Sequence, residues 1–124
     1  MSAEPQQRCL LGRKMHLKQS RDFARVRKEG RRLVQGCLIA NWQVLPTGAP
    51  MHLGVITTKK LGNAVVRARA RRLLREAFRL HQHDLTVPVD LVLVAQRTIV
   101  GKGFATVEGD FLAVLRKARL LKEK

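Results

Sequence analysis

The stretch KKLGNAVVRARARRLLREAFR, residues 59–79, decides how this chain folds. A Gly-Asn pair typical of a turn stands near its start, and Asn63 is a residue type that caps helix N-termini. We therefore expect a helix from Ala64 to about Leu80, because no Gly or Pro interrupts this part. Apolar side chains recur within it at helical spacing and predict one apolar face, made of Val66, Ala70, Leu73, Leu74, Ala77 and Leu80.

The same stretch is strongly basic. Eight of its 21 residues are Lys or Arg and one is acidic, so it carries +7 of the chain's formal net charge of +16. A row of arginines spaced four apart flanks the apolar face: Arg67, Arg71, Arg75 and Arg79. Like charges at this spacing repel by about 0.2–0.5 kcal/mol per pair. We expect an anionic partner, and nucleic acid phosphates fit best; the alternative is a solvated basic face without a partner.

Length and composition restrict the class of protein. A chain of 124 residues with 45% hydrophobic residues is expected to form one domain with a small core. No apolar run is long enough to span a membrane, and the N-terminus lacks the apolar segment of a signal peptide. Cys9 and Cys37 make neither a disulfide framework nor a metal site. We expect a cytoplasmic protein with reduced thiols and no membrane partner.

The region before the basic stretch predicts an arm, a short helix and two strands. Residues 1–18 are polar, basic and aperiodic, which indicates a flexible arm ahead of a single domain over residues 19–122. Ser20 is a candidate N-cap for a short helix that ends at Gly30. Apolar alternation predicts a strand over residues 38–45 and a second over residues 53–58. Because a Pro- and Gly-rich turn separates them, we expect an antiparallel hairpin.

The region after the basic stretch predicts a buried strand and a last helix. Residues 88–95 are almost continuously apolar, which favours a strand buried on both faces. Residues 101–103 indicate a loop, and helical spacing resumes from Thr106 to about Leu121. With one further short strand near Leu33, the order is α-β-β(-β)-α-β-α. This order predicts a small α+β sandwich whose mixed sheet contains one parallel strand pair around the arginine-rich helix.

We find no pattern of a protein active site. The nine carboxylates are scattered, whereas two-metal nucleases need a converging cluster, so surface roles are expected for them. His81 and His83 are two residues apart and do not share a helical face, so helix C-terminal capping is expected rather than metal binding. The segment 101–103 lacks the longer glycine loop that binds nucleotide phosphates. We therefore expect no catalytic residue and no protein-bound metal.

The basic stretch resembles the signature of the bacterial ribonuclease P protein subunits, called the RNR motif. That signature has the order Lys-Lys-x-Gly-Asn-Ala-Val-x-Arg-Asn-Arg-x-x-Arg-x-x-Arg. The resemblance covers roughly residues 16–120, and the order of elements agrees. Beyond the basic stretch it includes Arg21-Asp22-Phe23, Lys28-Glu29-Gly30, Leu53-Gly54-Val55 and residues 90–97.

The resemblance implies a division of labour between protein and RNA. A catalytic RNA subunit would cleave precursor tRNA with Mg²⁺ bound mainly by RNA, and the small basic protein would assist. In this family the arginine helix faces the RNA partner, and the positions here that match are Lys59, Lys60, Asn63, Arg67, Arg69, Arg71, Arg72 and Arg75. A cleft between the first helix and the sheet is expected to hold the single-stranded 5′ leader of the substrate, through Phe23, Arg27, Asn41 and Lys60.

Three positions depart from the family pattern. Ala68 stands where the RNR motif has Asn, and Arg27 and Asn41 stand where the cleft has aromatic residues. Stacking can contribute about 1–3 kcal/mol per base, so we expect this cleft to depend more on charge and hydrogen bonds. An arginine guanidinium can also stack on a base, so Arg27 can compensate in part. For Phe23 the alternative role is to hold the short helix on the sheet.

Other functions remain open at this point. A small basic ribosomal protein, or another rRNA-binding protein without a role in cleavage, would share the size, the charge and the flexible arm. A nuclease acting alone is disfavoured because no carboxylate cluster is present. A DNA-binding module is disfavoured because the chain has no recognisable helix-turn-helix or zinc pattern. No small-molecule ligand is expected.

Overall fold

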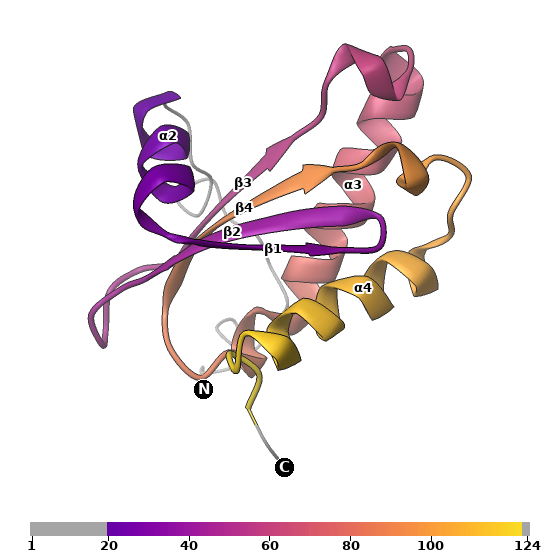
Figure 1. Ribbon diagram of the computed structural model, residues 1–124. Helices are drawn as coiled ribbons and strands as arrows, with labels where there is room; N and C mark the ends of the chain where they lie inside the picture. The colour runs from indigo at the N-terminus through magenta and orange to yellow at the C-terminus, as the bar shows by residue number, and fades with distance from the viewer. Residues whose placement is uncertain (1–19, 123–124) are drawn as a thin grey trace, which may run out of the picture.

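The computed structural model describes residues 20–122, and the predicted arm over residues 1–18 lies outside this part. Three helices and four strands make up the described fold (Figure 1). The helices are α2 (Ser20–Glu29), α3 (Ala64–His81) and α4 (Phe104–Lys117). The strands are β1 (Arg31–Gln35), β2 (Leu38–Val44), β3 (His52–Ile56) and β4 (Val89–Ala95). Short 3₁₀ turns are η2 (Lys59–Leu61), η3 (Gln82–Asp84) and η4 (Arg97–Ile99).

The four strands form one mixed sheet in the order β1-β2-β4-β3. β4 pairs antiparallel with β2, where Trp42 lies opposite Leu91, and parallel with β3, where Leu53 lies opposite the same Leu91. The strand–helix–strand unit β3-α3-β4 therefore contains the predicted parallel pair. The position of β4 in the sheet also confirms the prediction from its sequence, because six of its seven residues are buried.

The predicted hairpin between β2 and β3 is wrong. These strands do not pair, because β4 lies between them and pairs with both. A strand that is apolar on both faces has to be covered by neighbours on each side, which the interior of a sheet provides. The antiparallel hairpin is instead formed by β1 and β2, and Gly36 supplies a positive φ of 54° in their turn.

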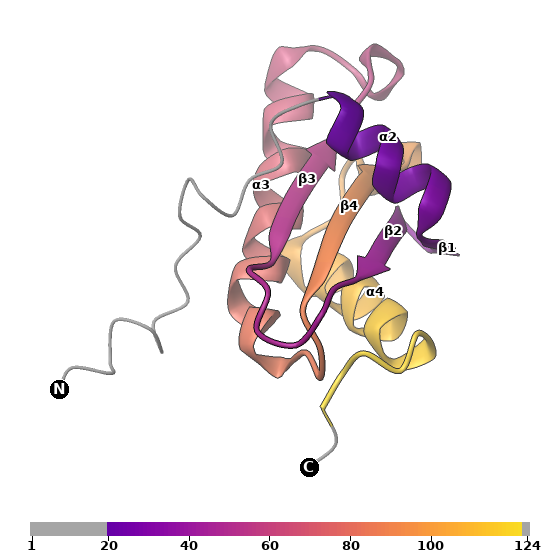
Figure 2. The ribbon, with the colours of Figure 1, turned by 90° about the vertical axis from the view of Figure 1, so that its left-hand side faces the viewer.

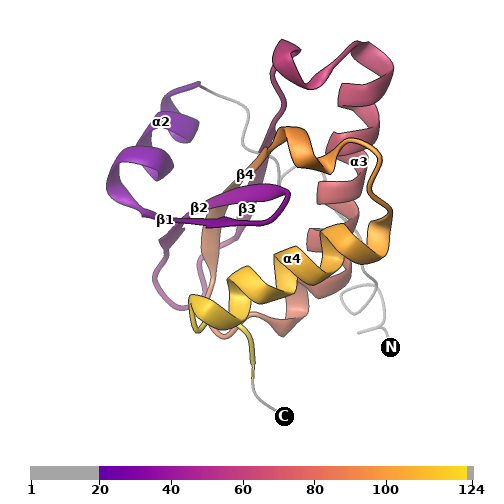
Figure 3. The same ribbon diagram turned by 45° about the vertical axis from the view of Figure 1, so that its right-hand side comes forward.

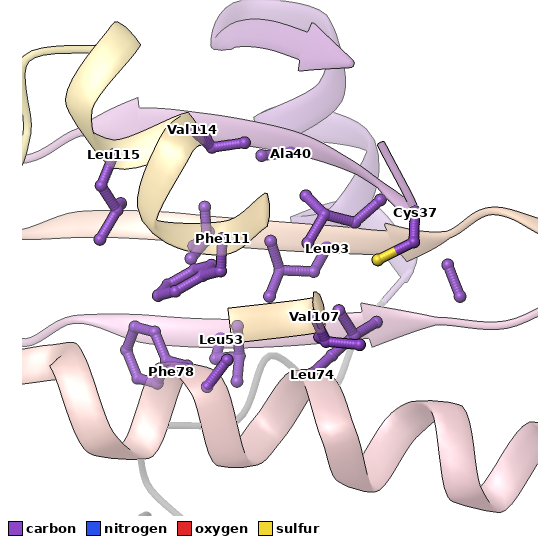
Figure 4. Packing of buried hydrophobic residues seen from close by; sticks show 14 of the residues in the cluster. Cys37, Ala40, Leu53, Leu74, Phe78, Leu93, Val107, Phe111, Val114 and Leu115 are labelled. Atoms are coloured by element: carbon purple, nitrogen blue, oxygen red, sulfur yellow. The ribbon is translucent and has the colours of Figure 1, made fainter. Parts of the chain in front are cut away.

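Helices cover both faces of the sheet. α2 lies across one face, and α3 and α4 lie against the other (Figures 1 and 2). The main core fills the space between the sheet and the two longer helices. Figure 4 shows Phe78 of α3 and Phe111 of α4 among strand residues such as Leu53 and Leu93, and all four are 0–1% exposed.

Helix boundaries differ from the expected ones at two places. Ser20 belongs to α2 instead of preceding it as the cap. α4 begins at Phe104 and ends at Lys117, earlier than the expected end near Leu121. It ends early because Arg119 adopts a left-handed φ of 60° and the Leu120 N–H donates to the Leu115 carbonyl, 2.8 Å away. Within residues 20–122, no helix is long and apolar enough to cross a membrane.

Candidate nucleic-acid interface

The basic helix α3 begins as its sequence predicts. The Asn63 side chain accepts a hydrogen bond from the Val66 N–H, 3.0 Å away, which satisfies one of the free donors of the first turn. Ala70, Leu74 and Ala77 of the predicted apolar face are buried against the sheet. Phe78 is also fully buried, although the predicted face did not include it. This packing leaves the arginines on the outer side of the helix.

The eight predicted RNA-binding residues lie on α3 and on the turn before it. Lys59, Lys60, Asn63, Arg69 and Arg72 are exposed, and Arg67, Arg71 and Arg75 are half-buried. Within residues 20–122, none of these cations forms an ion pair with a carboxylate. The outer side of α3 is therefore a positively charged surface without an acidic partner from this part of the chain.

Several of these arginines are held in place by neutral groups or by packing. The Arg71 guanidinium donates to the Thr57 hydroxyl, 2.8 Å away, and the Arg69 guanidinium donates to the Lys102 carbonyl, 2.7 Å away. The Nε atoms of Arg67 and Arg75 are buried and have no hydrogen-bond partner among residues 20–122. Buried donors of this kind are costly unless a partner satisfies them, and both side chains are held by the packing of their neighbours rather than by a hydrogen bond from Nε.

Arg79, the fourth member of the arginine row, has a different role. Its guanidinium pairs with Glu76 on the same helix, through a bond of 2.9 Å from Nε and a second contact from Nη2. The hydrogen bond from Arg79 lowers the pKa of the Glu76 carboxyl. The charge of Arg79 is thus compensated within α3, and the uncompensated row ends at Arg75.

An open hollow of about 430 Å³ lies between α2 and the first two strands, in the region where the leader cleft is predicted. Its lining includes Arg27 and Asn41, and it adds three residues that were not predicted as cleft residues: Ala24, Lys28 and Arg32. Asn41 is 2% exposed, so little of it is accessible from the hollow. Lys60 is exposed on η2 and is not part of this lining.

Phe23 lies on the same face of the sheet, packed on β3. A Cβ atom added at Gly54 would collide with the Phe23 ring, so the glycine allows the ring to approach the strand closely. Phe23 is half-buried and does not line the hollow beside Arg27. Its packing holds α2 against the sheet, and its ring remains partly accessible.

A buried carboxylate anchors α2 and was missed in the sequence. Asp90 is 4% exposed, although a surface role was expected for it. Its carboxylate accepts a hydrogen bond from Arg25 of α2 at 2.7 Å and lies 2.8 Å from Nδ1 of His52. Arg25 also bonds Gln43 of β2. The only sequence signal was an acidic residue inside an otherwise apolar strand, because a buried charge requires partners.

His81 joins the end of α3 to α4. Its Nδ1 lies 3.0 Å from an Asp84 carboxylate oxygen, and its Nε2 lies 2.8 Å from a Glu108 carboxylate oxygen. Burial works to lower the pKa of His81, but the hydrogen bonds to Glu108 and Asp84 outweigh it and raise the pKa. The side chain thus contacts carboxylates instead of the helix carbonyls that were expected, and His83 is exposed.

Neither Cys37 nor a cluster of metal ligands supplies a reactive group in residues 20–122. Burial, followed by the hydrogen bond with Asp110, raises the pKa of the Cys37 thiol to about 12, so the reactive thiolate is not formed near neutral pH. Over residues 20–122, no group of three His, Cys, Asp or Glu side chains could hold a metal ion. What this part of the chain presents is a charged binding surface.

Comparisons with known proteins agree on one family. The family model described as Ribonuclease P matches residues 11–119. The ribonuclease P protein component of Gluconacetobacter diazotrophicus is 39% identical over 103 residues, which cover 82% of this chain and 89% of that protein. The corresponding component of Syntrophomonas wolfei is 34% identical over 111 residues, covering 90% of this chain and 92% of that protein.

Solved structures show the same fold. The RNase P protein of Staphylococcus aureus has a TM-score of 0.76 at 23% identity, covering 87% of this chain and 98% of that chain. The RNase P protein of Thermotoga maritima has a TM-score of 0.72 at 25% identity, covering 82% of this chain and 96% of that chain.

Proposed function

This chain belongs to the ribonuclease P protein family, and on that premise we propose that it binds a catalytic RNA subunit through α3 and the 5′ leader of precursor tRNA through the α2 cleft. Members of the family are protein components of an endoribonuclease that processes tRNA. The relatives compared above are ribonuclease P protein components, so a ribosomal protein is not supported as the alternative.

The single observation that carries the proposal is the uncompensated row of arginines on α3. These side chains make no ion pair within residues 20–122. Phosphate oxygens are acceptors that suit guanidinium groups, and an RNA backbone presents them in a continuous series. The helix thus offers a rigid surface for a structured RNA.

The cleft beside α2 supports the second half of the proposal. It is lined by the cations Arg27, Lys28 and Arg32, and the half-buried Phe23 lies outside this lining on the same face of the sheet. A single RNA strand is bound by this combination of charge and stacking without strict sequence readout. In our proposal the protein acts in the cytoplasm and supplies binding, whereas the chemistry and the Mg²⁺ ions belong to the RNA.

Reconstitution tests this division of labour. Purified protein with Mg²⁺ and without RNA is expected to leave precursor tRNA intact, because the proposal assigns no catalytic group to the protein. Addition of the RNA subunit is expected to give cleavage at the mature 5′ end. Specific cleavage by nuclease-free protein alone would contradict the assignment of chemistry to RNA.

Cleft variants test the leader contact in the same assay. Arg27→Gln keeps a polar side chain and removes its charge, and it is expected to weaken binding of precursor tRNA by roughly two- to fivefold. Binding of mature tRNA, which lacks the leader, is expected to stay unchanged. Equal losses for precursor and mature tRNA would place Arg27 outside the leader contact.

A further inference from the structure

A second hollow lies on the side of the edge strand β1 that faces away from the hollow beside α2. It is open, has a volume of about 440 Å³, and lies between β1, β2 and the end of α4. Leu33 and Trp42 supply apolar lining, and Trp42 is 6% exposed. Figure 3 shows the beginning of β1 and the end of α4 on the side of the molecule away from α3. This hollow is therefore separate from the arginine surface of α3.

The lining of this hollow is strongly basic. Its charged residues are Arg31, Arg32, Lys117 and Arg119, and all four are exposed. No carboxylate lines it, and none of the four cations forms an ion pair within residues 20–122. The Lys117 ammonium donates to the Gln35 side-chain oxygen, 2.6 Å away, which holds it beside β1. Four uncompensated cations around one hollow fit an anionic ligand.

Arg119 stands at a backbone position that favours glycine. Its φ is 60°, and it ends α4 where left-handed residues are usually Gly or Asn. A side chain with a Cβ is strained in this conformation. The arginine is present in spite of this strain, and its side chain borders the hollow. Arg119 therefore places a cation beside the hollow at some cost in local stability.

Arg32 connects the second hollow to the leader cleft. Side chains alternate across a strand, so Arg31 lies on the α4 face of β1, opposite Trp42, and Arg32 lies on the α2 face, opposite Asn41. Arg32 contributes to the lining of both hollows. Because β1 is an edge strand, no further strand separates the two sides. A basic band thus runs from Arg27 and Lys28 around the edge to Lys117 and Arg119.

We propose that this band is a path for single-stranded RNA, in which the leader leaves the α2 cleft around β1 and places its upstream phosphates in the hollow at the end of α4. This inference rests on the proposed function, because it extends the leader contact beyond the cleft. The contacts are charge–phosphate contacts, so the path is independent of base sequence. Short leaders end within the cleft, and only longer leaders reach the second hollow.

Leader length is the variable that tests the path. Precursor tRNAs with leaders of graded length are bound to holoenzyme carrying Arg119→Gly, Lys117→Gln or both. Each substitution is expected to weaken binding of long-leader substrates by roughly two- to fivefold and to leave short-leader substrates unchanged. The slope of log affinity against log salt for long leaders should flatten by about 0.7 per lost contact. The double variant should lose about the product of the single effects.

Two controls separate folding and general charge from the path. Arg119→Gly places glycine where the backbone favours it, so the melting temperature is expected to stay the same or rise while long-leader binding falls. Arg97→Ala removes one exposed cation from η4, outside both hollows, and is expected to show no dependence on leader length.

These experiments distinguish a failure of the path from a failure of the proposed function. If Arg27→Gln weakens binding of precursor and the Arg119 and Lys117 variants act equally on all leader lengths, the cleft holds and the path is refuted. If the Arg119 and Lys117 variants weaken binding of the RNA subunit as much as they weaken binding of long-leader substrate, when no substrate is present, the hollow belongs to that subunit. This result would also refute the path. If affinity does not depend on the leader at all, the leader contact of the proposed function itself fails.

Discussion

Asp90 shows how one buried side chain can set the position of a binding cleft. It lies on the α2 face of β4 and links Arg25 of α2 to His52 of β3. With Phe23 packed on Gly54, this network sets where α2 crosses the sheet. The cleft lies along the same helix, so its width depends on contacts that do not themselves face RNA.

Replacement of Asp90 by Asn is expected to lower the free energy of unfolding by about 1–3 kcal/mol. Asn keeps the shape but loses the charge that pairs with Arg25, and removal of one partner leaves the other poorly satisfied. Urea unfolding of the purified protein measures the change. Asp22→Asn, at a position in the first turn of α2, is the control, with an expected loss below about 1 kcal/mol. Equal losses of unfolding free energy in the two variants would show that the buried network does not contribute to stability.

The sequence could predict Arg27 and Asn41 as cleft residues only through the family resemblance. The charge of Arg27 and the polarity of Asn41 do not by themselves indicate that the two residues line the same hollow. Arg32, Lys117 and Arg119 were missed because they come from two separate segments, β1 and the end of α4, that meet only after the sheet and α4 have packed. Asp90 was assigned to the surface because its partners, Arg25 and His52, are 65 and 38 residues away.

Among the helices, the end of α3 is joined to α4 by one titratable side chain. His81 lies at the last residue of α3 and contacts Glu108 of α4 and Asp84 of η3. The folded protein binds this proton more tightly than the unfolded chain, because its pKa is raised above 6.5. The stabilisation is therefore complete below pH 6.5 and is lost as the pH rises through the raised pKa.

His81→Gln is expected to remove this pH dependence. The parent should be more stable than the variant at about pH 6, and the difference should shrink toward about pH 9, when the imidazole is neutral. Thermal melts of both proteins across this range measure it. A difference that is constant over the range would mean that His81 contributes by packing alone, for example against Phe111.

Helix α3 was predictable in its bounds because several local signals agree there. Asn63 caps the helix, the apolar period places Ala70 and Leu74 inward, and no breaker interrupts it. The pairing of β2 was not predictable in the same way. Alternation shows which side chains share a face, but it does not identify the neighbouring strand. The wrong hairpin followed from sequence proximity, whereas β4, from beyond α3, lies between β2 and β3 with six of its seven residues buried.

For the whole molecule, the net charge of +16 predicts opposite salt responses for stability and for RNA binding. The free protein is expected to melt at a higher temperature when sodium chloride rises, because salt screens the repulsion among its cations. RNA-subunit affinity is expected to fall log-linearly over the same range, and Arg71→Ala and Arg75→Ala should each flatten that slope by about 0.7–0.9. Melting and binding curves in the same buffers provide both measurements. An unchanged slope in both variants would place the RNA surface elsewhere.

The order of strands in the sheet has a consequence for the nascent chain. β4 occupies an interior position but follows β1, β2, β3 and α3 in the order of synthesis. Until β4 has emerged from the ribosome, the edges of β2 and β3 that pair with it have no partner strand. The apolar face of α3 then has only an incomplete sheet to pack against. Native contacts across the sheet therefore form only when the last third of the polypeptide emerges. A ribosome that stalls soon after α3 leaves a basic, unclosed intermediate with two open strand edges, which are the features that favour aggregation and RNA association before folding.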